Sequence, residues 1–261
     1  MVGSSSDRAE TTDSPPAATV PTRPDVRGCL DRVYDPELDR SIVELEYIDE
    51  IEIDAGEVTV EFTLPTAWCS PAFAWMMATD ARDEIHSLPA TESVTIRLQD
   101  HMHGEEITDG VNNRESFESV FPDADDGVSD VRAMLDDKAR FARQHDAVQA
   151  CLDAGLTPEQ IVDLRRGDID VADEGAIVSV RGIHVVVDRE PLTDYLEKAS
   201  ASGLVTDQED RLFLTIDGDP IPVDSFEILH KRTRLAGVNM GGQGAVCDAL
   251  NQSRRAKLDK D

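Results

Sequence analysis

Apolar and polar residues alternate most clearly between residues 58 and 64. Every second side chain there is apolar, which is the two-residue period of a strand with one buried face. Residues 48–53, with apolar side chains at 48, 51 and 53, also indicate a strand, and the turn-forming sequence Asp54-Ala55-Gly56-Glu57 joins the two segments. The pattern therefore predicts a β-hairpin. Residues 94–98 alternate again and predict a third strand.

Two helices are predicted around these strands. Apolar residues recur at helical spacing over residues 73–88, after a good N-cap residue, Ser70, and a proline at the first helical position. An earlier helix begins near Asp25 and ends at the Tyr34-Asp35-Pro36-Glu37 turn, because the residue before a proline is pushed out of helical geometry. The order helix, strand, strand, helix, strand predicts an α+β domain in which helices cover one sheet.

The second half of the chain predicts a mixed α/β module. Residues 107–113 are turn-rich, and the apolar residues at 117, 120 and 121 are expected to pack back on the first domain. The remaining periodicity predicts helices at 128–154, 192–199 and 223–236, strands at 168–171, 176–180 and 183–187, and a flexible glycine-rich turn at 237–244.

These patterns divide the chain into four parts. The first is a tail rich in Ser, Thr, Pro and Ala without apolar periodicity, which predicts disorder. The predicted organisation is a disordered tail (1–24), a first domain (25–105), a connecting segment (106–127) and a C-terminal module (128–261).

Charge narrows the range of partners. The chain has 54 acidic and 25 basic residues, for a net charge of −29, and only five of the basic residues are Lys. Such a surface repels phosphate, so nucleic acids and anionic membranes are poor partners. Concentrated salt would screen the self-repulsion, which favours a protein adapted to a salt-rich cytoplasm. The absence of a long apolar run and of a secretory N-terminus also predicts a cytoplasmic location.

The four cysteines are widely scattered, and no Cys-x-x-Cys pair occurs, so neither a zinc ribbon nor a disulfide framework is indicated. Cys69 stands between the second strand and the second helix. Unpaired N–H groups and the helix dipole at that position favour a reactive thiolate, which binds metals and attacks electrophiles. The alternative is a small apolar residue that fills a tight corner.

His101 and His103 follow the third strand. Alternate residues of an extended segment point the same way, so both imidazoles could face one metal ion together with Cys69. Surface or loop-anchoring histidines are the alternative interpretation. We therefore take Cys69, His101 and His103 as candidate metal ligands.

Several motifs resemble a known family over about residues 26–105. They are Asp35-Pro36-Glu37, Ser41-Ile42-Val43-Glu44-Leu45, Thr66-x-x-Cys69-x-Pro71, and Leu88-Pro89 before the third strand. Their order is similar to the small iron–sulfur cluster assembly domain of PaaD-like and SufT-like proteins. One segment departs from it, because this chain has Leu45-Glu46-Tyr47-Ile48 where the family usually has Leu-Gly-Leu-Val.

The resemblance implies a part in building or delivering iron–sulfur or related metal centres. It implies that Cys69 is the reactive or ligand cysteine, and that Thr66, Asp35 and Glu37 are motif positions with a structural role. The cargo would be an iron–sulfur cluster or iron, with zinc as an alternative, and the partners would be client apo-proteins or other assembly proteins. One thiolate cannot supply the about four ligands that a cluster takes, so a second subunit of a homodimer, a partner or nearby imidazoles must contribute.

The C-terminal half is superficially similar to tyrosine recombinases at residues 154–164 and 168–170. The catalytic residues of that family are absent, because Thr157 stands where the first arginine is expected and residues 244–261 contain no tyrosine. Without them, no covalent phosphotyrosine forms and no arginine clamp stabilises the phosphate. We interpret the similarity as a degenerate relationship or a chance one, and expect the module to bind a client or a second copy.

Three functions therefore stay open: a non-catalytic assembly factor, a metal-free protein–protein adaptor, and a DNA-binding protein derived from an integrase. The last would use a basic patch built from Arg165-Arg166, Lys231-Arg232 with Arg234, and Arg254-Arg255. The chain has no glycine-rich phosphate loop, no Gly-x-Ser-x-Gly elbow and no His-Glu-x-x-His helix, so we do not expect a conventional enzyme.

Overall fold

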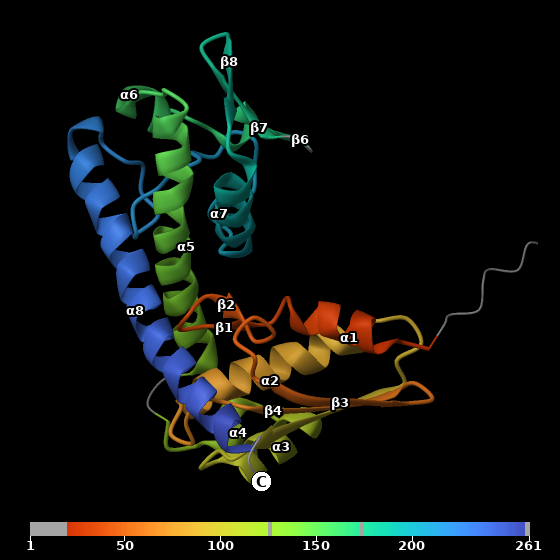
Figure 1. Ribbon diagram of the computed structural model, residues 1–261. Helices are drawn as coiled ribbons and strands as arrows, with labels where there is room; N and C mark the ends of the chain where they lie inside the picture. Colours follow the sequence, from red (N-terminus) through yellow and green to blue (C-terminus); the bar gives the residue numbers. More distant parts are fainter. Residues whose placement is uncertain (1–19, 125–126, 173–174, 259–261) are drawn as a thin grey trace, which may run out of the picture.

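A computed structural model describes residues 20–124, 127–172 and 175–258 (Figure 1). The predicted tail lies outside the described residues up to position 19. The helices are α1 (Arg23–Leu30), α2 (Pro71–His86), α3 (Gly104–Asn112), α4 (Phe117–Val120), α5 (Val128–Asp153), α6 (Pro158–Ile161), α7 (Arg189–Ala201) and α8 (Phe226–Leu258). The strands are β1 (Tyr34–Asp35), β2 (Arg40–Ser41), β3 (Ile48–Asp54), β4 (Glu57–Thr63), β5 (Ser93–Gln99), β6 (Ile169–Ala172), β7 (Gly175–Val180) and β8 (Ile183–Val187). The predicted α+β class is confirmed.

The first domain is a three-stranded sheet in the order β3-β4-β5. The predicted hairpin is present as the antiparallel pair β3 and β4, and α2 crosses over to bring β5 parallel to β4. Buried side chains from α1, α2 and the strands share one core. This connection fixes the site, because the chain leaves β4 and enters α2 at the corner that contains Cys69.

Residues 104–112 form the helix α3, so the prediction of a turn-rich segment there is wrong. Ile107 and Val111 are buried in the first core one helical turn apart. Gly110 is needed for close packing, because a Cβ at this position would lie 2.7 Å from the ring of Trp75. The expected packing of the next segment is confirmed, since Phe117 belongs to the first core and Phe121 packs against it.

α3 also covers the free edge of β5. The Asn112 amide accepts from the Ile96 N–H (2.9 Å) and donates to the Ile96 carbonyl (2.8 Å), while Thr108 Oγ1 accepts from the Leu98 N–H (3.1 Å). Two side chains therefore provide the hydrogen bonds that another strand would provide. Such protection keeps an edge strand from pairing with other chains.

Asn112→Leu should destabilise the protein by about 1–3 kcal/mol, since it leaves both backbone groups of Ile96 without their partner. The free energy of unfolding in urea measures the effect, and light scattering measures any self-association of the exposed edge. Asn113→Leu is the matched control, because that side chain has no hydrogen bond to β5 within the described residues. Equal stability of the Asn112 variant and the native protein would contradict this account of the edge.

The C-terminal module has its own core between α5, α7 and the antiparallel sheet β6-β7-β8. Its longest helix, α8, runs beside α5 and extends down to the first domain (Figure 1). The predicted flexible turn at residues 237–244 is wrong, because these residues lie inside α8. Contacts at both ends of α8 hold this glycine-rich stretch in the helix: Phe226 is buried in the second core, and Asn251 is buried on the first domain.

Gly241→Ala and Gly242→Ala should each stabilise the protein by about 0.5–1 kcal/mol, because alanine loses less conformational freedom than glycine in a helix. Both positions are exposed, and a Cβ there would meet no atom within 4 Å. Thermal unfolding followed by circular dichroism measures the shift. Gly110→Ala is the opposing control, since its Cβ would clash with Trp75. A loss of stability in the two exposed variants would contradict the helical assignment.

Arginines of α5 and side chains of α8 tie the two parts together. Arg143 of α5 makes two hydrogen bonds to the Asp39 carboxylate (2.6 and 2.9 Å), and Arg132 makes two to Asp80 of α2 (2.8 and 3.0 Å). From α8, Arg254 pairs with Asp49 at 3.0 Å. None of the described helices combines the length and apolarity needed to cross a membrane.

Candidate functional site

A short turn presents Cys69 between β4 and α2. Thr66 shapes this turn, because its hydroxyl accepts from the Trp68 N–H (3.2 Å) and its carbonyl accepts from the Cys69 N–H (3.3 Å). The Met102 N–H donates to the Ala67 carbonyl (3.0 Å), which anchors the turn to the segment after β5. Thr66 therefore has a positional role, and the backbone around Cys69 is fixed from two sides.

His101 clamps the same turn. Its Nδ1 accepts from the His103 backbone N–H (3.1 Å), and its Nε2 lies 3.0 Å from the Cys69 carbonyl oxygen. Since Nδ1 accepts, the ring proton belongs on Nε2, which donates to Cys69. Burial lowers the pKa of His101, in agreement with a neutral ring. Both ring nitrogens are therefore engaged, Nε2 with the Cys69 turn and Nδ1 with the backbone of His103.

The two histidine rings face different partners. Their ring centroids lie 6.3 Å apart, and His103 Nδ1 is directed to Glu106 Oε1 at 3.7 Å. Among the described residues, no group of three or more His, Cys, Asp or Glu side chains gathers in a geometry that could hold a metal ion. This arrangement gives no support to the expected site of Cys69, His101 and His103, and places His101 in the loop-anchoring role instead.

The thiol of Cys69 is half-buried, and its electrostatic surroundings reverse the expectation from its position. Burial raises its pKa to about 12, and the carboxylates of Asp35 and Glu37 act in the same direction. The Ser70 N–H at the start of α2 opposes this effect weakly. Burial and the two carboxylates therefore oppose the thiolate that the helix N-terminus is predicted to favour.

Asp35 is a buried structural residue. Its Oδ1 accepts from the backbone N–H groups of Glu37 (2.9 Å) and Leu38 (3.2 Å), and its Oδ2 accepts from the Tyr47 hydroxyl (3.2 Å). Burial raises the pKa of this carboxyl group even though three donors face it. Glu37 is half-buried and accepts from Gln243 of α8 at 3.1 Å. Both motif carboxylates therefore shape the loop that faces Cys69.

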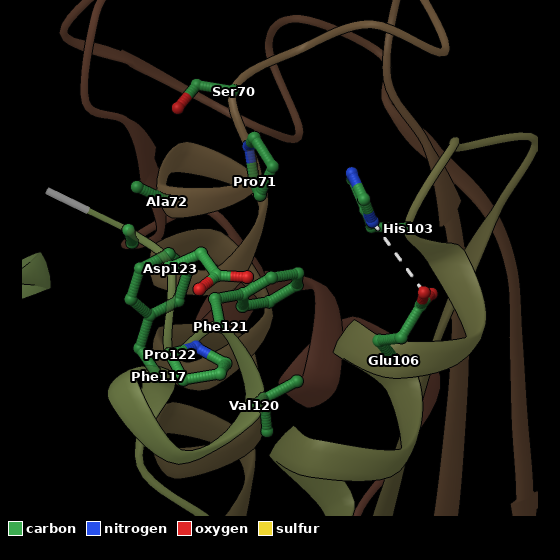
Figure 2. A pocket seen from close by; sticks show the side chains of 11 residues that line it. Ser70, Pro71, Ala72, His103, Glu106, Phe117, Val120, Phe121, Pro122 and Asp123 are labelled. Atoms are coloured by element: carbon green, nitrogen blue, oxygen red, sulfur yellow. Dashed lines mark ion pairs between the residues drawn. The ribbon is translucent and has the colours of Figure 1, made fainter.

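A pocket of about 470 Å³ opens beside the start of α2 (Figure 2). Pro71, Phe117, Val120 and Phe121 give it an apolar wall, and the pair of His103 and Glu106 forms its polar side. Two large apolar side chains next to Cys69 are exposed as well: Trp68 is 75% accessible and Met102 is 50% accessible. The surface around Cys69 is therefore apolar and open to contact.

Cys247 is the residue near this site that the sequence did not assign to it. It lies on α8, is half-buried, and packs against the first core, as Cys69 does. Cys247 is among the groups that raise the pKa of Cys69, after burial, Asp35 and Glu37. Only the return of α8 to the first domain could have revealed this, and no local motif marks it.

The fold and this corner define a class: a small α+β domain with a thiol at a strand–helix junction, extended by a helical module. The family model for iron–sulfur cluster assembly proteins matches residues 23–98, from α1 to the end of β5, and the chain belongs to that family. An uncharacterized protein of Methanocaldococcus jannaschii, MJ1129, is 31% identical over 96 residues, which are 36% of this chain and 98% of that protein. The relative therefore has no counterpart to the larger part of this chain.

The family match ends before the C-terminal module, and the similarity of that module to tyrosine recombinases is not confirmed. One residue of each basic group also faces a carboxylate. Arg165 faces Glu209, Lys231 faces Glu227, and Arg254 faces Asp49. This placement gives no support to a common nucleic-acid patch.

Proposed function

We propose that the protein is a non-catalytic, cytoplasmic assembly factor that holds an iron–sulfur cluster, or its iron, at Cys69 and passes it to a client apo-protein. Membership of the iron–sulfur cluster assembly family gives the general role. To this general role we add three points: the use of Cys69, transfer to a client protein, and the direction of that transfer. Zinc stays an alternative cargo, since it also binds thiolate.

The incomplete ligand set is the observation that best supports delivery. Cys69 is held firmly at an apolar surface, but the described part of the chain offers no group of three or more metal ligands around it. A cluster takes about four protein ligands, so a single chain would share it with another protein. Cargo that is held by few ligands passes readily to a client that supplies more.

Anaerobic reconstitution with iron and sulfide tests the proposal. The native protein should acquire the visible absorbance of an iron–sulfur cluster and retain iron through gel filtration, and Cys69→Ser should lose at least tenfold of the bound iron. Cys151→Ala is the matched control, since it removes a thiol buried in the second core. Unchanged iron content in the Cys69 variant would overturn the proposal and favour the metal-free adaptor, with which the high pKa of Cys69 agrees.

A second variant distinguishes binding of the cluster from its transfer to a client. Trp68→Ala removes an exposed ring next to Cys69 and no buried contact, so we expect normal cluster content but slower transfer to an apo-ferredoxin acceptor. Met134→Ala is the control, because that exposed side chain belongs to α5. Equal transfer rates for the two variants would contradict client contact at the Cys69 surface.

A further inference from the structure

The last part of α8 reaches the first domain (Figure 1), and Cys247 in this part of the helix packs against the first core. Four residues before it, Gln243 donates to Glu37, and four residues after it, Asn251 donates to the Leu45 carbonyl at 2.8 Å. Residues four apart share one side of a helix. The Cys247 side chain therefore faces the same loop of the first domain.

Neighbouring contacts fix the rotation of α8 at this point. Asp248 accepts two hydrogen bonds from Arg40 (3.0 and 3.2 Å), and Gly244 is buried, where an added Cβ would lie 3.8 Å from Arg40 and 4.0 Å from Leu38. Close packing and ion pairing thus act on both sides of Cys247. These contacts fix the position of Cys247 relative to the loop of the first domain.

Cys69 approaches the same loop from the strand–helix corner. Both cysteines are half-buried and pack against the first core. Burial raises the pKa of both thiols, and the carboxylates of Asp35 and Glu37 add to this effect at each of them. The Tyr47 hydroxyl donates to Asp35, and burial, Asp35 and the two cysteines all raise its pKa. Two thiols that are far apart in the sequence therefore share one set of neighbours.

We propose that Cys69 and Cys247 form a two-thiol site for an iron–sulfur cluster, to which the family domain contributes one sulfur and α8 the other. This inference rests on the proposed function and adds a ligand from α8, which lies outside the residues 23–98 that the family model matches. Two thiolates are half of the about four ligands that a cluster takes, and a client supplies the rest.

Binding takes place by ligand exchange. Each thiol gives its proton to the thiolate that it displaces from the incoming cluster, so atoms and charges balance and no oxidant or reductant is consumed. The iron ions withdraw charge from the new thiolates, which offsets their repulsion by Asp35 and Glu37. Burial, with a smaller effect of the same two carboxylates, raises the pKa of both thiols.

A trivalent arsenical tests the geometry without iron. Phenylarsine oxide forms two As–S bonds and releases water only where two thiols reach the same arsenic atom. We expect one arsenic per folded chain, linking the peptides of Cys69 and Cys247 in mass spectrometry. Cys247→Ser and Cys69→Ser should each abolish the adduct, while Cys151→Ala should retain it. A folded native protein without this adduct would overturn the paired site.

Cluster retention then separates the two proposals. If Cys247→Ser and Cys69→Ser both lose at least tenfold of the reconstituted iron, the two-thiol site is supported. If only Cys69→Ser loses iron, the inference fails and the proposed function stands. If neither loses iron, the proposed function fails as well. Native circular dichroism spectra of both variants check that the loss does not come from unfolding.

Discussion

Cys69 should react with iodoacetamide at least about tenfold more slowly at pH 7.5 than cysteine in the unfolded chain, because only the thiolate attacks and the pKa of this thiol is raised to about 12. Its rate should continue to rise about tenfold per pH unit between pH 8 and 10, where an ordinary cysteine levels off. Peptide mapping by mass spectrometry measures the rate of each cysteine separately in one sample.

The pH profile distinguishes the electrostatic cause from simple steric blocking. Steric blocking lowers the rate by the same factor at every pH, whereas a raised pKa moves the whole profile to higher pH. Asp35→Asn should shift the profile back toward lower pH, because it removes a negative charge and keeps an acceptor for the N–H groups of Glu37 and Leu38. A profile that levels off near pH 9 in the native protein would contradict the proposed cause.

The first domain follows from its sequence because its signals are local. The alternation in β3 and β4 and the Ser70-Pro71 start of α2 are decided by neighbours a few residues away, and the motif around Cys69 pointed to the correct family. The charge state of Cys69 does not follow, since desolvation and the approach of Asp35 arise only when the chain folds.

Whether a glycine marks a turn or lies inside a helix depended on tertiary packing more than any other feature of this sequence did. Gly110 predicts a turn by itself but lies where α3 meets the ring of Trp75, and the glycines of residues 237–244 lie in a helix that is anchored at both ends. The position of Cys247 against the first domain depends on the same anchoring of α8. The sulfur that we propose as the second ligand therefore could not be assigned before the helix that contains it was placed.

Arg143→Met should lower the free energy of unfolding by about 3–5 kcal/mol, the usual cost of breaking a buried ion pair from one side. The Asp39 carboxylate is only 8% exposed, and without Arg143 its nearest remaining cation is Lys198, at 3.8 Å. The substitution also removes the guanidinium that lies 5.4 Å above the ring of Tyr34. Urea unfolding in concentrated salt measures the loss, because surface ion pairs are screened there.

Arg132→Met is the matched control. Arg132 is also an arginine of α5 with two hydrogen bonds to a carboxylate of the first domain, but both partners are more than one third exposed, so we expect a loss of about 1 kcal/mol or less. The double variant Arg143→Met with Asp39→Asn should recover much of the stability, since no buried charge is left unpaired. If the double variant loses as much unfolding free energy as the two single variants lose together, the two side chains are not coupled. In that case, α5 would be held to the first domain by its apolar contacts, and the position of the whole module beside the Cys69 corner would not depend on this pair.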